Sequence, residues 1–163
     1  MRGVPSASRD DKAISKTSLN KEIASLPAVA RNDEIKTANI ILTGQKKYSE
    51  IPLYLKAADC LVITGTAKDE RSFRFTSPLK LFEYMASARP IVASDTESIR
   101  EVLEHKKNAW LVRPDDEKAM ADGIMFILNT PDSADNFAKQ ARFDVENYTW
   151  GKRAEKIISA INS

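Results

Sequence analysis

Short apolar runs alternate with longer amphipathic stretches from residue 38 to the end of the chain. Four of these runs are rich in Val, Ile, Leu and Ala, which predicts strands at 39–43, 60–64, 90–94 and 109–112. The intervening and following stretches have the spacing and start signals of helices, which we expect at 49–58, 77–87, 97–104, 115–129, 133–147 and 150–161. Ser49 is the expected cap of the first helix, and Trp150 is expected to pack the last one.

The predicted strands are apolar throughout, without alternation of polar and apolar residues. Such strands are covered on both faces, which is typical of a parallel sheet between layers of helices. The predicted fold class is therefore α/β, with a Rossmann-like parallel sheet and helices on both faces. Ligands of such sheets bind at the carboxyl ends of the strands, so the loops after Gly44, Thr64 and Ser94 are the places to look for a site.

The first 36 residues have a different composition, rich in Ser, Lys, Asp and Asn. We interpret 1–36 as a polar tail or linker, with one short helical stretch at 21–30 that ends near Pro27. The folded domain is expected to occupy 37–163.

Composition excludes several classes of protein. Hydrophobic residues make up 42% and charged residues 29%, which suits a globular core, and the net charge of +2 gives no reason to expect nucleic acid. Cys60 is the only cysteine and lies in an apolar run, so we expect a buried thiol. The chain has neither an apolar run of ~20 residues nor an apolar leader. We expect a cytoplasmic protein, with peripheral contact to the inner membrane face left open.

The stretch 77–83, Ser-Pro-Leu-Lys-Leu-Phe-Glu, is the strongest candidate for chemistry. Ser77 is a good N-cap, and Pro78 suits the first helical position. The free N–H groups of Leu79 and Lys80, together with the Lys80 charge, would attract a phosphate. Glu83, one turn further on, could accept two hydrogen bonds from a ribose diol.

A plainer interpretation of the same stretch stays open at this point. Ser-Pro is a common helix start, and Lys80 and Glu83 would form an exposed ion pair worth a few tenths of a kcal/mol. Leu79, Phe82 and Ala86 share another face of the helix, which we expect to pack on the sheet.

Other polar residues carry weaker signals. His105 lies in a polar turn and is expected at the surface, and Asp115 and Asp116 are expected to begin a helix with an acidic first turn. The loop 68–71 is expected to be solvated, with a reach of Arg71 or Arg74 towards phosphate as the alternative. No metal ligands and no cofactor are predicted.

The run 77–95, followed by Ser-Ile-Arg-Glu-Val at 98–102, resembles the signature of family 4, group 1 retaining glycosyltransferases of the GT-B fold. The flanking pieces 41–44, 51–59, 108–112 and 149–150 agree with that family, so the resemblance covers about residues 38–161. It implies the C-terminal domain, which binds a nucleotide-diphospho-sugar donor whose sugar goes to a glycan or lipid-linked acceptor.

The resemblance also assigns roles to residues. Glu83 corresponds to the second acid of the family's Glu-x7-Glu motif, which implies that it binds the ribose hydroxyls. The helix start would face the diphosphate and the sugar, and backbone would flank the base. These implied donor-binding residues are Thr76, Ser77, Leu79, Lys80, Glu83, Gly44 and Ile51. The family uses no metal site, and fixed dipoles and cations stabilise the leaving diphosphate.

The sequence departs from the family in two places. Phe75 stands where the first acid of the motif is expected, which weakens the assignment of the sugar. Two strand–helix units expected before 39, with their basic clamp, and the acceptor-binding N-terminal domain are not found in the sequence. In the order 3-2-1-4-5-6, the run 39–43 would be strand 3 and 60–64 strand 4. We therefore expect a fold truncated at the N-terminus, whose unpaired sheet edges favour self-association.

Three functions remain for comparison with the structure. The first is the donor-binding part of a retaining glycosyltransferase, which we expect to be inactive without its partner domain. The second is a nucleotide-binding fragment without transfer activity, and the third is a Rossmann-like regulatory module. The stretch 77–83 separates the third from the other two.

Overall fold

The computed structural model describes residues 43–76 and 79–162. The chain divides into two units, Met1–Leu53 and Tyr54–Ser163, and we describe each by itself. The prediction for 1–36 lies outside the described residues, as does most of the predicted strand 39–43. The second unit holds all of the described strands.

In the first unit, residues 43–47 have no regular structure, and Gly44 has a φ of 66°. A 3-10 turn, η1 (Tyr48–Glu50), then leads directly into helix α2 (Ile51–Ala57), whose last four residues are counted with the second unit. The helix was predicted, but the prediction of Ser49 as its cap is wrong. Ser49 lies inside η1, and the Glu50 carboxylate instead accepts the backbone N–H of Lys47 at 2.9 Å.

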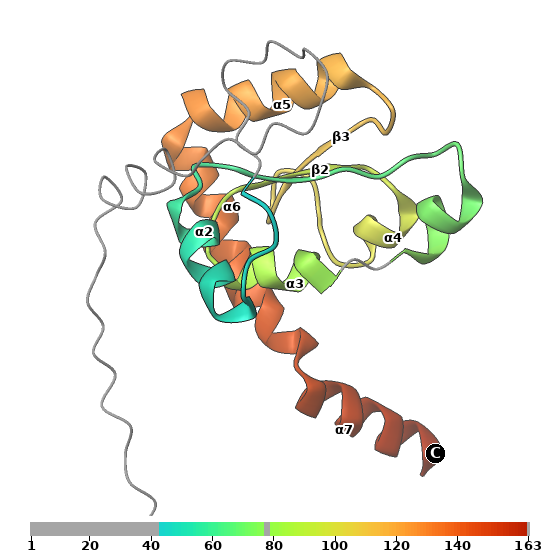
Figure 1. Ribbon diagram of the computed structural model, residues 1–163. Coiled ribbons are helices and arrows are strands. Elements are labelled where there is room, and N and C mark those ends of the chain that lie inside the picture. The colour runs from blue at the N-terminus through green and yellow to red at the C-terminus, as the bar shows by residue number, and fades with distance from the viewer. Residues whose placement is uncertain (1–42, 77–78, 163) are drawn as a thin grey trace, which may run out of the picture. The chain divides into compact units, whose positions relative to one another are not determined.

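The second unit contains a parallel sheet in the order β1-β2-β3 (Figure 1). Its strands are β1 (Leu61–Ile63), β2 (Ile91–Ser94) and β3 (Trp110–Val112), which confirms the predicted strands at 60–64, 90–94 and 109–112. The register pairs Val62 with Val92 and Val92 with Trp110. The order agrees with strands 4-5-6 of the predicted doubly wound sheet.

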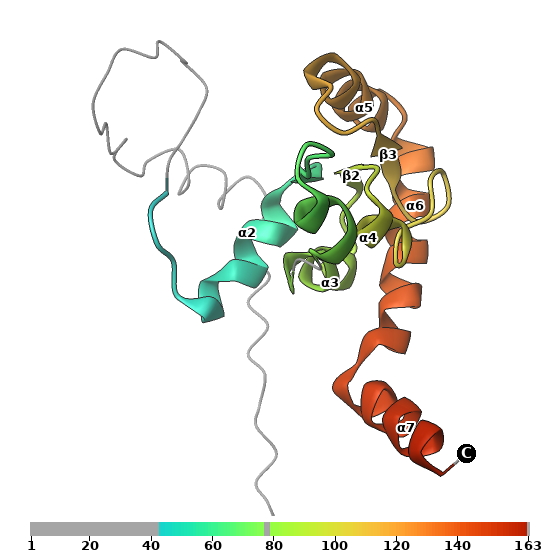
Figure 2. The same ribbon diagram turned by 90° about the vertical axis from the view of Figure 1, so that its right-hand side faces the viewer.

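Helices cover both faces of this sheet, as predicted. Helices α3 (Leu79–Ala86) and α4 (Glu97–Arg100) lie below the strands in Figure 1, and α5 (Glu117–Asn129) lies above them. Helix α6 (Pro131–Asp144) contributes to the core on both faces, since Ala141 belongs to one buried cluster and Phe137 to the other. Figure 2 shows α6 running from α5 past the strands.

The α3 face of the sheet is the more completely buried. Leu81 and Met85 of α3 are fully buried against Ile63, Ile91 and Ala93 of the strands. The prediction that Leu79 and Ala86 pack on the sheet is wrong, because Leu79 is 77% exposed and Ala86 is also exposed. Leu79 lies in the first turn of α3, and the sheet-facing row of this helix runs through Leu81 and Met85 instead.

The α5 face packs closely through a glycine. A Cβ added to Gly123 would lie 2.9 Å from both Trp110 Cδ1 and Val112 Cγ1, so only glycine lets α5 approach β3 this closely. The Trp110 ring stacks on Phe126 of α5 with ring centroids 3.8 Å apart. Cys60 borders the same cluster and is half-buried, where a buried thiol was predicted. Burial raises the pKa of its thiol to about 11.

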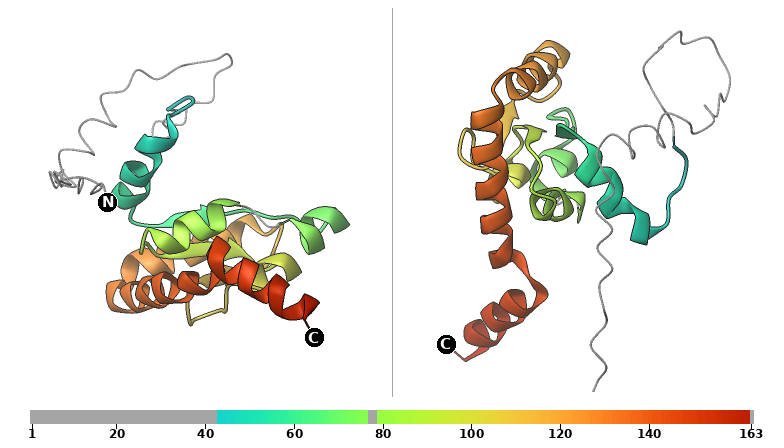
Figure 3. Two further views of the ribbon diagram at one scale, coloured as in Figure 1. Left: turned by 90° about the horizontal axis from the view of Figure 1, so that it is seen from below. Right: turned by 90° about the vertical axis from the view of Figure 1, so that its left-hand side faces the viewer.

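The last helix, α7 (Trp150–Ile161), follows the 3-10 turn η3 (Val145–Tyr148) and has no buried residue. The helix itself was predicted, but the prediction that Trp150 packs it is wrong, since Trp150 is 79% exposed. Figure 3 shows α7 extending away from the sheet and from the other helices of this unit. Within the described residues, no helix combines the length and apolar character that crossing a bilayer requires.

His105 was predicted to be a surface residue, and it is exposed, but it also has a structural role. Its Nδ1 accepts the backbone N–H of Leu111 at 3.0 Å, which satisfies a donor of β3. Strand β3 lies at the edge of the described sheet, where such donors need a partner. The ring also lies against Trp110, with centroids 4.7 Å apart.

Acidification should therefore destabilise the protein through His105. Burial and the charge of Lys106 lower the pKa of His105 below its usual value. The neutral ring is favoured in the folded state, so its contribution is present above pH ~6.5 and is lost as the pH falls through the lowered pKa. Urea unfolding at pH 7.5 and 5.5 should show a larger loss of stability in the wild type than in His105→Gln. Because the chain has one histidine, an equal loss in both proteins would contradict this role.

Candidate functional site

The candidate site lies at the carboxyl edge of the sheet, where the loops after β1, β2 and β3 come together. The loop after β1 contacts the loop after β3, because the Ala67 N–H donates to Asp115 Oδ2 at 2.8 Å. The Asp95 N–H, just after β2, donates to the Val112 carbonyl oxygen at 2.7 Å. These bonds join the loops after β1 and β2, which the sequence predicted at this edge, to the end of β3 and the loop that follows it.

Asp115 and Asp116 have different roles at the start of α5. Asp116 is the N-cap, since its Oδ1 accepts the Ala119 N–H at 2.8 Å, which confirms the predicted helix start. Asp115 has a positive φ of 57° and contacts the β1 loop instead. Hydrogen bonds from Thr66 and from the Ala67 N–H lower the pKa of Asp115. The residues that the structure describes contain no group of acidic, His or Cys side chains suited to a metal ion.

The loop between β1 and α3 is more ordered than the sequence indicated. It includes one π-helical turn, η2 (Arg71–Phe75), where no helix was predicted. The Arg74 guanidinium lies 3.6 Å from Glu70 and 3.4 Å from Glu97, so η2 is tied to the first turn of α4. In this arrangement Arg74 pairs with carboxylates, rather than remaining unpaired as a phosphate ligand.

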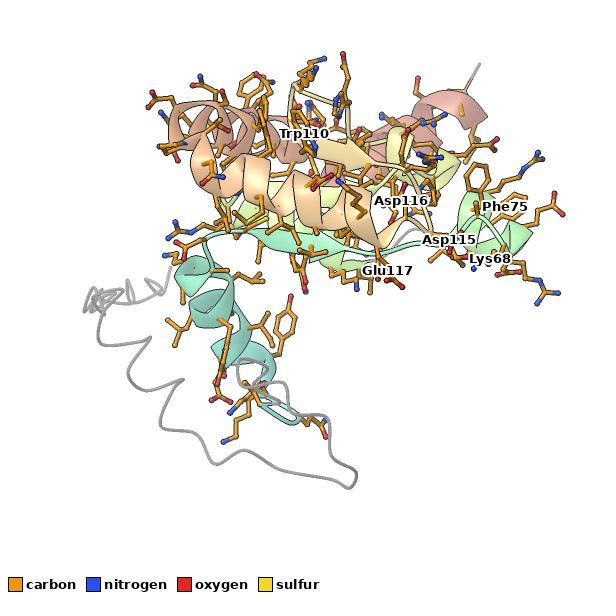
Figure 4. All side chains as sticks on the ribbon, turned by 90° about the horizontal axis from the view of Figure 1, so that it is seen from above. Lys68, Phe75, Trp110, Asp115, Asp116 and Glu117 are labelled. Carbon is orange, nitrogen blue, oxygen red and sulfur yellow. The ribbon has the colours of Figure 1, made fainter. Side chains whose placement is uncertain are left out.

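Phe75 occupies the outer end of this loop. Its side chain is 75% exposed, and Figure 4 shows it on the same side of the molecule as Lys68 and Asp115. The next residue, Thr76, has an extended backbone, and its hydroxyl donates to the Arg71 carbonyl oxygen at 3.1 Å. The loop therefore presents an aromatic ring just before the start of α3.

The start of α3 contains three of the predicted donor-binding residues. Leu79 and Lys80 lie exposed in its first turn, and Glu83 is half-buried one turn further on. No ion pair joins Lys80 to Glu83 in the part of the chain that the structure describes, so the plainer interpretation of these residues as an ion pair is wrong. The Glu83 charge acts on its neighbour, because burial and Glu83 together raise the pKa of Tyr84.

The other predicted site residues lie elsewhere in the chain. Ser77 and Pro78 are outside the described residues, so the predicted N-cap stays a prediction. Gly44 and Ile51 belong to the first unit, and their predicted place beside the base likewise stays a prediction.

The sequence did not predict two contacts that join loops, the hydrogen bond from Ala67 to Asp115 and the ion pair of Arg74 with Glu97. The one local signal was the Pro-Asp-Asp at 114–116, since Asp is among the few residues other than glycine that adopt a positive φ. Nothing local indicated which segment the Asp115 carboxylate would contact, because its partner Ala67 lies 48 residues away.

The geometry defines an α/β domain with a helix start at the carboxyl edge of a parallel sheet, as in nucleotide-binding proteins. The chain matches the family described as "Glycosyl transferases group 1" over residues 18–130. It belongs to this family, which confirms the predicted resemblance.

Individual relatives agree with this assignment. The amylovoran biosynthesis glycosyltransferase AmsK of Erwinia amylovora is 32% identical over 80 residues, which are 49% of this chain and 19% of that protein. The sucrose-phosphate synthase structure from Thermosynechococcus elongatus has a TM-score of 0.60 and 25% identity, over 73% of this chain and 28% of that one. Anabaena HepE, solved in complex with UDP-glucose, has a TM-score of 0.60 and 20% identity over 69% of this chain and 30% of its own.

Each of these matches covers only part of the relative's length. The segment that matches AmsK spans about a fifth of that protein's length, and the structural matches span under a third of theirs. The chain therefore corresponds to part of a GT-B glycosyltransferase, as the sequence predicted.

Proposed function

We propose that this chain is the donor-binding part of a retaining glycosyltransferase that transfers a sugar from a nucleotide-diphospho-sugar to a glycan or lipid-linked acceptor. The observation that carries the proposal is the start of α3 at the carboxyl edge of the sheet, with Lys80 and Glu83 one turn apart and not paired with each other. Family membership supports it, and so does the UDP-glucose complex of the HepE structure.

Each part of the donor would meet a group suited to it. The free N–H groups at the start of α3, with the exposed Lys80 ammonium, would stabilise the diphosphate as negative charge develops on the leaving group. The Glu83 carboxylate would accept hydrogen bonds from the ribose diol. Thr76 and Ser77 would lie on the sugar side, while Gly44 and Ile51 would flank the base. No metal ion and no cofactor take part in the proposed reaction.

Transfer would need a second body to hold the acceptor. We propose that the chain alone binds the donor without transferring its sugar, and that an acceptor-binding N-terminal domain completes the enzyme. Its proposed location is the cytoplasm, with peripheral contact to the inner membrane face where the acceptor is lipid-linked. A nucleotide-binding fragment without any transfer role is the second candidate, and the exposed Phe75 in place of the expected acid favours it.

Replacing Glu83 should test the donor site directly. We expect Glu83→Gln to weaken UDP-glucose binding roughly 10- to 100-fold, because hydrogen bonds to a charged group each contribute ~1.5–3 kcal/mol. Isothermal titration of UDP-glucose and of GDP-mannose into the full chain would measure the loss and show which base is preferred. Glu155→Gln makes the same charge change on the exposed helix α7 and should bind like the wild type. Equal binding by wild type and Glu83→Gln would overturn the role of Glu83.

A further inference from the structure

Asp115 connects two loops that belong to different strands of the sheet. Its Oδ2 accepts the Ala67 N–H at 2.8 Å. Thr66 and Ala67 follow β1, whereas Asp115 follows β3, and β2 lies between these two strands. The contact therefore crosses the carboxyl end of the central strand.

The backbone of Asp115 is shaped for this contact at a cost. Its φ of 57° lies in the left-handed region, which is strained for a residue with a Cβ, although Asp adopts it more readily than most residues. Asp116 already caps α5, so the helix start does not need the Asp115 carboxylate. From this conformation the Asp115 side chain accepts the hydrogen bond of the Ala67 N–H.

The loop that Asp115 holds leads directly to the proposed donor site. From Thr66 and Ala67 the chain continues through η2 to Phe75 and Thr76, and then to the start of α3. The Lys68 N–H donates to Thr66 Oγ1 at 3.1 Å, so the held segment is itself folded into a turn. In Figure 4, Lys68 lies beside Asp115 at the end of the molecule where Phe75 is also found.

We infer that Asp115 is a positioning residue for the donor, which fixes the β1–α3 loop so that Thr76 and the start of α3 meet the diphosphate and the sugar. This inference rests on the proposed function. Asp115 acts through the loop and does not itself touch the donor. The pair of Arg74 with Glu97 fixes the other end of the same loop.

Three substitutions separate this role from a contribution to stability. Asp115→Gly removes the carboxylate but suits a positive φ, so the melting temperature should stay close to that of the wild type. We expect this variant to bind UDP-glucose about tenfold more weakly, because the donor would then bind to a β1–α3 loop that lacks the hydrogen bond from Ala67 to the charged Asp115 carboxylate. Asp115→Asn keeps an oxygen that accepts the Ala67 N–H and tolerates the backbone, so it should restore binding to within about twofold of the wild type.

Asp116→Ala is the matched control. It removes the cap of α5 and should lower the melting temperature while UDP-glucose affinity stays unchanged. Amide hydrogen exchange gives a readout that needs no ligand. The amide of Ala67 should exchange faster in Asp115→Gly than in the wild type, and not faster in Asp116→Ala.

The outcomes distinguish the inference from the proposed function. If the wild type binds UDP-glucose and Asp115→Gly binds it equally well, the positioning role is overturned and the proposed function stands. Unchanged exchange at Ala67 in Asp115→Gly would overturn the contact itself. If the wild type binds neither UDP-glucose nor GDP-mannose, the proposed function fails, and the donor-positioning role falls with it.

Discussion

Replacing Leu81 with Ala should lower the free energy of unfolding by about 2–5 kcal/mol, the usual range for a leucine removed from a packed core. Leu81 is completely buried, and it belongs to the cluster that joins α3 to Ile63 and Ile91 of the sheet. Because small domains are stable by only about 5–15 kcal/mol, this loss is a large fraction of the total. It should also reduce donor binding indirectly, since α3 carries Lys80 and Glu83.

Leu79→Ala is the matched control on the same helix. Leu79 is 77% exposed, and a surface change of this kind usually stays within about 0.5 kcal/mol. Urea unfolding followed by circular dichroism, at one pH and temperature, would compare the two variants. A loss in Leu79→Ala as large as that in Leu81→Ala would mean that α3 packs through the face expected from the sequence.

The wrong expectation for α3 has a simple physical origin. Leu79, Leu81, Phe82, Met85 and Ala86 give the helix apolar residues on most of its circumference. Periodicity alone then identifies the helix, but it leaves open which row faces the sheet. Packing against the sheet determines which row is buried. The row through Leu81 and Met85 is buried, while Leu79 lies exposed in the first turn.

Elements that depend on local signals were predicted well. The strands β1, β2 and β3 are continuous apolar runs between polar residues, and α5 begins after Asp116, whose side chain caps it. Helix α4 ends at Arg100 rather than at the predicted Glu104. The chain turns there because Asn108 accepts the Glu104 N–H at 2.7 Å, and Lys106 adopts a φ of 63°.

In the candidate site too, features with a local sequence signal were predicted, and contacts between distant segments were not. The residue types at the start of α3 indicated a phosphate and a diol, because that pattern is contiguous in the sequence. The bond from Ala67 to Asp115 and the pair of Arg74 with Glu97 join segments that are distant in the chain. Only the folded sheet brings their loops to one edge, so no local pattern could predict them.

Asn108→Ala should be the most damaging change of a polar residue outside the site. Asn108 is 3% exposed, and its Nδ2 donates to the Val102 carbonyl oxygen at 3.3 Å and to Asp144 Oδ2 at 2.8 Å. Its Oδ1 accepts the Glu104 N–H at 2.7 Å. Each buried group left without a partner costs about 1–3 kcal/mol, so we expect a total loss of about 3 kcal/mol in urea unfolding. Asn147→Ala, at an exposed position nearby, should change stability little.

Asn108→Asp sharpens this test, because it keeps the shape and changes one donor into an acceptor. At pH 7 the new carboxylate would face Asp144 across the former hydrogen bond, and repulsion between like charges should destabilise the fold. The same repulsion raises the folded-state pKa of the new group above its unfolded value of about 3.9. The unfolded state then binds fewer protons than the folded state. The loss of unfolding free energy relative to the wild type should therefore shrink as the pH falls from 7 towards 4. Asn147→Asp should show no such recovery, and a deficit in Asn108→Asp that is independent of pH would mean that Asp144 does not face this position.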